Sequence, residues 1–285
     1  MRNKTRAVFK MTIGLLVMAG SVPAATSINT CPFVITSPGD YLLSADLICG
    51  GGNAITITSN NVTLKLEGHK ITAGAGAVFA ISNVSENKPR PASGVSILGP
   101  GLITNGGANA FQEGIFLSGF VNQAEVNGVT VRGASVGIGT FDCFNVTITA
   151  NTLGRNGVGI SMINVDPGTI TGNNVSGNGT GIIIDNADVS LTDKTVVTHN
   201  IVNGNTGDGV QINDDGPLLF PTVTVQNNVT SGNGGNGISF LTAIEISSNK
   251  SLANGMFDLF SQGPNCSGVV LSGNTFFTAN QSCIH

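Results

Sequence analysis

Apolar and polar residues alternate in short runs along most of the chain, and many of these runs begin at a glycine. Six such units start at Gly114, Gly137, Gly159, Gly181, Gly209 and Gly237. Successive glycines of this set are separated by 22 to 28 residues, and such a recurrence indicates an internal structural repeat. Alternation with a period of two predicts short β-strands, and the high density of glycine and asparagine disfavours helices.

Asparagine recurs at the ends of these predicted strands in two series. The first series comprises Asn151, Asn173, Asn200, Asn227, Asn249 and Asn274. The second series, a few positions further on in each unit, comprises Asn156, Asn178, Asn205, Asn233 and Asn254. Isolated hairpins of this length would leave their apolar faces exposed, whereas stacked coils pair equivalent strands in parallel and bury one continuous core. The repeat therefore predicts an all-β fold, a parallel β-helix of about nine coils.

Two Asn-x-Ser/Thr triplets, at Asn174 and Asn178, fall within this pattern. Asparagine in a turn tolerates left-handed backbone geometry, and equivalent amides one coil apart can bond to each other. We therefore interpret the triplets as parts of the turns and not as glycan acceptors.

The N-terminal residues have the pattern of a secretory signal peptide. Basic residues at Arg2, Lys4, Arg6 and Lys10 precede an apolar run at 11–20, and small residues follow, so cleavage is expected after Ala24 or Ala25. No stretch is long enough for a membrane helix, so we expect an extracytoplasmic (periplasmic or extracellular) chain without a membrane span. A net charge of −4 without basic clusters gives no reason to expect nucleic acid as a partner.

The cysteines all follow the predicted cleavage site. Cys31 and Cys49 lie near the start of the mature chain, and Cys266 and Cys283 lie near its end with a similar spacing. In an oxidising compartment the simplest pairing is one disulfide at each end, which leaves Cys143 free. The alternative is that several of these residues are buried thiols.

The repeats resemble those of right-handed parallel β-helix proteins of the pectin-lyase-like superfamily. The resemblance covers 53–278, and the segment CPFVITSPGDYLLSADLICGGGNAITITSNNVTLKLEGHKI is similar to the lead-in and first coil of many secreted members. The expected organisation is a signal peptide at 1–25, an N-terminal cap at 26–52, the β-helix at 53–264, and a last coil with its cap at 265–285. The superfamily includes lyases, hydrolases, epimerases, adhesins and passive stalks, so the fold does not determine an activity.

Superposing the coils on their glycines places acidic residues near one edge of a strand ladder. The candidate site residues are Asp142, Asp166, Asp185, Asp214 and Asp215, with Lys194 as a candidate base. Such a column could supply carboxylates for acid–base chemistry on a sugar, or oxygen ligands for Ca²⁺ at Asp214 and Asp215. The alternative is that each aspartate closes a turn by bonding its own backbone, and that Lys194 is a solvated lysine paired with Asp193.

Motifs of known enzymes of the superfamily are incomplete in this chain. Mannuronan-epimerase-like proteins carry Asp-Pro-His, whereas Asp166-Pro167 is followed by Gly168. No ligand set with the spacing of a zinc or copper site occurs. His199 is expected to be a turn or packing residue, and Cys143 a packed or turn thiol without a neighbouring base.

Two functions remain open at this point. The first is a secreted protein that binds or processes a polysaccharide, of the uronate type that the resemblance implies, as a lyase, hydrolase or epimerase if it is an enzyme. The second is a non-catalytic surface or matrix protein that acts as a structural or adhesion module. An enzyme requires acids and a base that converge in a cleft, whereas a passive rod leaves each acid bonded within its own turn.

Overall fold

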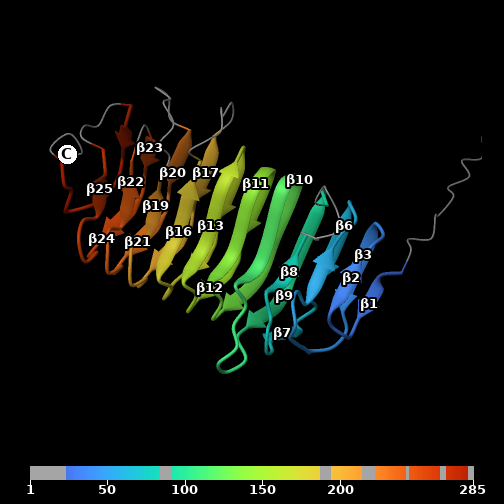
Figure 1. Ribbon diagram of the computed structural model, residues 1–285. Helices are drawn as coiled ribbons and strands as arrows, with labels where there is room; N and C mark the ends of the chain where they lie inside the picture. Colours follow the sequence, from blue (N-terminus) through green and yellow to red (C-terminus); the bar gives the residue numbers. More distant parts are fainter. Residues whose placement is uncertain are drawn as a thin grey trace, which may run out of the picture.

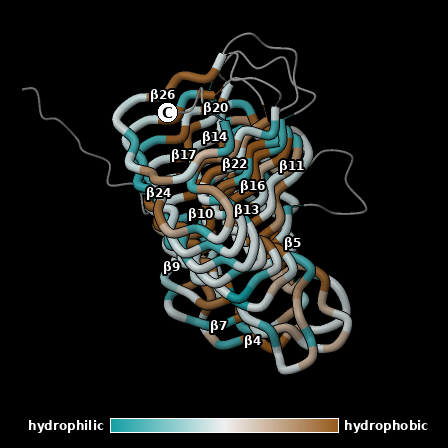
Figure 2. The backbone as a smooth tube through the Cα atoms, turned by 90° about the vertical axis from the view of Figure 1, so that its left-hand side faces the viewer, coloured by the Kyte–Doolittle hydropathy of each residue, from teal (hydrophilic) through white to brown (hydrophobic). Residues whose placement is uncertain are grey.

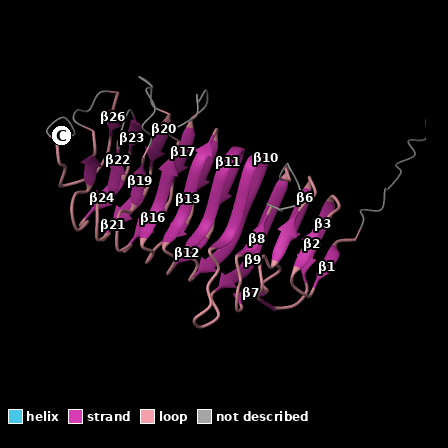
Figure 3. Cartoon of the chain, in the orientation of Figure 1, coloured by secondary structure: helices cyan, strands magenta, loops and turns pink. Residues whose placement is uncertain are grey.

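The computed structural model describes residues 24–83, 92–186, 194–213, 222–241, 244–263 and 268–281. These residues form parallel strands joined by short turns (Figures 1 and 3). Within these ranges there is no helix, and hence none long and apolar enough to cross a membrane. The expected signal peptide up to residue 23, the pair Asp214 and Asp215, and the expected Cys266–Cys283 disulfide lie outside the described residues.

The strands wind around one axis and form three parallel faces, which we name A, B and C. Face A comprises β2 (Phe33–Ile35), β5 (Ile55–Ile57), β8 (Phe79–Ser82), the first parts of β10 (Glu113–Arg132) and β11 (Val136–Thr149), β13 (Val158–Val165), β16 (Thr180–Asp185), β19 (Val210–Ile212), β22 (Ile238–Phe240) and β25 (Leu259–Ser261).

Face B comprises β1 (Thr26–Ile28), β3 (Gly39–Leu43), β6 (Val62–Lys65), the first part of β9 (Val95–Thr104), the middle of β10, the second part of β11, β14 (Gly168–Thr171), β17 (Thr195–Thr198), β20 (Val223–Gln226), β23 (Ile244–Ser247) and β26 (Val270–Ser272). Face C comprises β4 (Leu47–Cys49), β7 (Lys70–Ala73), the last parts of β9 and β10, β12 (Thr152–Gly154), β15 (Asn174–Val175), β18 (Ile201–Asn203), β21 (Val229–Ser231) and β24 (Lys250–Leu252).

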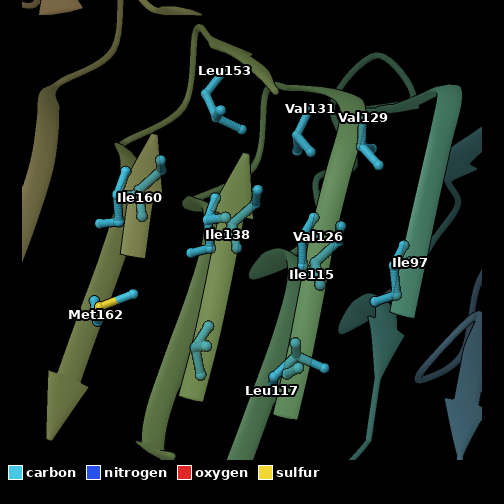
Figure 4. Packing of buried hydrophobic residues seen from close by; sticks show 14 of the residues in the cluster. Ile97, Ile115, Leu117, Val126, Val129, Val131, Ile138, Leu153, Ile160 and Met162 are labelled. Carbon is cyan, nitrogen blue, oxygen red and sulfur yellow. The ribbon is translucent and has the colours of Figure 1, made fainter. Parts of the chain in front are cut away.

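The core consists of aliphatic side chains that stack in register from coil to coil. On face A, Ile115 pairs with Ile138, which pairs with Ile160, and all three are fully buried. Figure 4 shows these side chains together with those of the other two faces, all directed into the same interior. Viewed from the C-terminal end, the coils lie over one another (Figure 2). Burial of each large aliphatic side chain stabilises the fold by about 1.5–3 kcal/mol, and the stack extends this from coil to coil.

The two asparagine ladders are confirmed, with one correction. The amide of Asn173 donates to Oδ1 of Asn200 at 3.0 Å, and the amide of Asn178 donates to Oδ1 of Asn205 at 3.1 Å. The prediction of Asn227 was wrong, because the amide of Asn200 donates instead to Oδ1 of Asn228.

A left-handed residue directly precedes each ladder asparagine, and this explains the error. In the first ladder these residues are Ala150, Gly172, His199, Asn227, Ser248 and Gly273, with φ between 54° and 65°. Asn227 occupies that turn position, with a φ of 55°, and leaves the inward position to Asn228. The interpretation of His199 as a turn residue is confirmed by its φ of 56°.

The cysteines follow the expected pattern as far as the structure describes them. Cys31 and Cys49 form a disulfide near the N-terminal end of the solenoid. Cys143 forms no disulfide with a described cysteine and is buried, as expected for a packed thiol. Its Sγ lies 3.2 Å from the carbonyl oxygen of Phe141.

Candidate functional site

A groove of about 660 Å³ lies on the outer side of face B. Its floor consists of the outward side chains of four neighbouring strands, which pair in the order Thr63, Ser96, Glu125 and Thr147. Because side chains alternate along a strand, the residue that follows each floor residue points inward. Leu64, Ile97 and Val126 are three such residues, and they are fully buried. The groove therefore rests on a rigid, close-packed support.

The wall of the groove is formed where the chain turns from face A into face B. Asn61, Gly94, Gln123 and Asn145 line it, and each has a positive φ, between 53° and 66°. These residues occupy equivalent turns of successive coils. The amide of Asn145 donates to Oδ1 of Asn122, which precedes Gln123, at 2.9 Å, so a side-chain hydrogen bond links the last two of these turns.

Two phenylalanines of β11 that lie close to Asn145 in sequence are partly exposed, and neither is among the lining residues of the groove. Phe141 exposes 40% of its surface and Phe144 37%, and Phe144 directly precedes the groove residue Asn145. The hydroxyl and amide groups of the lining suit a ligand that carries many hydroxyl groups. Glu125 is the only charged side chain among the lining residues, and its Oε1 accepts a hydrogen bond from Asn127 at 3.1 Å.

The described candidate acids lie near the turn from face A to face B in three successive coils. Asp142 has a φ of 52° and accepts a hydrogen bond from the Asn164 amide at 3.1 Å, so it bonds within the turn ladder. Asp185 ends β16 and pairs with Ile163, and Asp166 precedes a cis peptide bond to Pro167. Within the described ranges, no three His, Cys, Asp or Glu side chains come together as metal ligands. Catalytic roles for these acids stay predictions.

Lys194 is directed along face B and not into the groove lining. Its Nζ lies 3.1 Å from Oε2 of Glu245, which is on β23, two coils further along. The side chains of both residues are partly exposed. The lysine is therefore in a surface ion pair, and a role as a base stays a prediction.

The Asp166-Pro167 pair is followed by a buried glycine, Gly168. Gly168 is buried, and a Cβ added there would overlap Sδ of Met162, which lies in the core. A histidine at this position, as in the Asp-Pro-His motif, would therefore require the side chain of Met162 to move.

Glu113 is a titratable residue that sequence reasoning missed. Burial raises the pKa of its carboxyl from 4.5 to about 7. Its Oε2 is buried and has no hydrogen-bond partner among the described residues. The side chain lies over Gly139 of the next coil, so no local pattern around Glu113 signals its environment.

The parallel faces, inward aliphatic stacks and asparagine ladders define a β-solenoid. The family model described as right handed beta helix region matches residues 93–251, and the chain belongs to this family. No curated protein matches the chain.

Solved structures with the same fold include two Azotobacter vinelandii enzymes. The A-module of mannuronan C-5 epimerase AlgE6 has a TM-score of 0.57 at 17% identity, with 87% of this chain and 79% of that chain covered. The A-module of mannuronan C-5 epimerase AlgE4 has a TM-score of 0.54 at 15% identity, with 86% and 91% covered. The periplasmic alginate epimerase AlgG matches with a TM-score of 0.49 at 16% identity, over 85% and 70%. At these identities the likeness is one of fold.

Proposed function

We propose that this protein binds a polysaccharide in the groove on face B. The observation that carries the proposal is the groove's lining of hydroxyl and amide side chains, namely Thr63, Ser96, Gln123, Asn145 and Thr147. Sugar rings present hydroxyl groups at their edges, and such a lining can donate hydrogen bonds to them and accept hydrogen bonds from them. The neighbours named as mannuronan C-5 epimerases are consistent with a polysaccharide ligand.

The charge of the lining favours a neutral chain. Glu125 faces the ligand without a basic residue among the lining side chains, so a uronate would place its carboxylate against another. A uronate-type glycan, the kind that the family resemblance implies, is therefore expected to require calcium as a bridging ion.

The proposal is one of binding, not of epimerisation at Asp166. Gly168 stands where an Asp-Pro-His motif has its histidine. Catalysis by Asp142, Asp166, Asp185, Asp214, Asp215 or Lys194 would be a separate property with its own readout, the release of unsaturated or shortened products.

The Cys31–Cys49 disulfide supports an extracytoplasmic location, because disulfides persist in oxidising compartments. Polysaccharides of cell surfaces and matrices are accessible there. An extracytoplasmic location would place the groove in the compartment where such ligands occur.

Affinity electrophoresis and calorimetry with neutral and uronate-containing oligosaccharides, with and without calcium, test the proposal. The double substitution Gln123→Ala and Asn145→Ala removes two amides from the wall and should weaken binding about tenfold, at about 0.5–1.5 kcal/mol per hydrogen bond. Asn174→Ala removes an exposed amide on face C and serves as the matched control. If no glycan binds, or if the control weakens binding as much, the groove is not the site and a passive rod is the better description.

A further inference from the structure

The outer side of face A carries a carboxylate, that of Glu113, which is not among the groove's lining residues; we call its surroundings over Gly139 the recess. Glu113 begins the face A part of β10, and its side chain extends over Gly139 on β11. A Cβ added at Gly139 would overlap Oε2 of Glu113, so the missing side chain of this glycine makes the space that the carboxylate fills. The recess therefore depends on a pair of residues from two adjacent coils.

Two phenylalanines lie next to Glu113 and Gly139 in the strand register. Phe79 pairs with Glu113 in the register of β8 and β10, and Phe116 pairs with Gly139. The ring centroids of Phe79 and Phe116 lie 4.9 Å apart. The next coil adds Ser161, which pairs with Gly139 on its other side. The surroundings of the carboxylate are thus mainly apolar and aromatic.

No positive charge of the described strands compensates this carboxylate. β8 and β13 contain no charged residue, and the only one in β11 is Asp142, beyond Gly139 along the strand. Within β10 itself, Glu125 lies on face B and Arg132 on face C, away from the recess. Burial of an unpaired carboxylate is unfavourable, and it is this burial that raises the pKa of Glu113 to about 7.

We propose that this recess binds an ammonium group carried on a small apolar body, that is, a primary or quaternary amine. The cation would pair with the carboxylate of Glu113, and the neighbouring phenyl rings attract cations through their electron-rich faces. A neutral sugar has no positive charge to pair with the carboxylate of Glu113, and this carboxylate repels an anion. The site is separate from the groove on face B, so it does not depend on glycan binding.

Calorimetry with butylammonium, and with 1-butanol as its neutral counterpart, tests the proposal on the unaltered protein. At pH 8 butylammonium should bind, and 1-butanol should bind at least tenfold more weakly. At pH 5 only about one carboxyl in a hundred is ionised for a pKa of about 7, so the apparent affinity should fall about a hundredfold. Equal binding of the two compounds, or an affinity independent of pH, would overturn the proposal.

Substitutions in the recess test whether butylammonium binds there. Glu113→Gln should abolish the preference for butylammonium, and Phe116→Leu should weaken binding several-fold through loss of one ring. Glu67→Gln removes a carboxylate from an exposed turn and should leave binding unchanged. Butylammonium binding that survives Glu113→Gln would refute the assignment, provided that far-ultraviolet circular dichroism shows the variant folded. Glucosamine and the amide of Nα-acetyl-lysine, each compared with its N-acetylated form, then separate an amino sugar from a lysine side chain as the source of the ammonium group.

Discussion

The substitution Glu113→Gln should change how the stability of this protein depends on pH. In the folded state the carboxyl has a pKa of about 7, whereas an exposed glutamate has a pKa of 4.5. Between these two values the folded protein holds a proton that the unfolded chain has already released. The free energy of unfolding therefore decreases as the pH rises through this window, and the full contribution is present only below about pH 4.5.

The size of this loss in the free energy of unfolding follows from the pKa shift of Glu113. At about 1.4 kcal/mol per unit, a rise from 4.5 to about 7 corresponds to a loss of up to about 3 kcal/mol between pH 4.5 and pH 8. The glutamine of the variant has no proton to release, so the variant lacks this loss. Asp258 does not affect stability in the pH range where Glu113 titrates. Burial raises the pKa of Asp258, but hydrogen bonds from Phe277 and Asn254 outweigh burial and lower it. The stabilising contribution of Asp258 is therefore lost only at more acidic pH.

Urea denaturation followed by circular dichroism at pH 5, 6, 7 and 8 measures the difference between the two proteins. We expect Glu113→Gln to gain up to about 3 kcal/mol relative to the wild type across this range. Glu67→Gln is the control for the loss of one negative charge and should not show this gain. A difference between wild type and Glu113→Gln that is constant with pH would show that the carboxyl is not held in a desolvating site.

Two further substitutions test the scaffold that supports both surfaces. Asn200→Ala removes an amide side chain that makes five hydrogen bonds within the first ladder. The substitution should lower the free energy of unfolding by about 3 kcal/mol or more, because buried hydrogen-bond partners are left unsatisfied. As a control, Asn174→Ala at an exposed neighbouring position should change the free energy of unfolding by less than about 0.5 kcal/mol. Equal effects of the two substitutions in urea denaturation would contradict the ladder's role. Replacement of Cys31 and Cys49 by serine opens a loop with a sequence separation of 18 and should lower the free energy of unfolding by about 3 kcal/mol. The same assay should show a lower urea midpoint. An unchanged midpoint would show that the disulfide does not stabilise the N-terminal end.

The residue pattern within single coils was enough to predict the architecture, because each coil of a solenoid has the same order of strands and turns. The alternation of apolar residues predicted the strands, and the spacing of asparagines predicted that amides such as those of Asn173 and Asn178 stack one coil apart. The error at Asn227 has a local cause. Two adjacent asparagines suit both the left-handed turn and the ladder, and only the register of β20 decides that Asn228 is the inward one.

The sequence alone predicted the solenoid and its ladders except at Asn227, and it favoured the pairing of Cys31 with Cys49, since each of these predictions rests on spacing along the chain. The tertiary structure alone decided which polar residues form a surface site. The groove joins Thr63 to Thr147 across four stacked strands, and Glu113 takes its properties from Gly139 in the next coil. Such properties depend on which side chains lie across adjacent coils, because lateral contacts set burial and charge compensation, and a repeat leaves these positions free to vary.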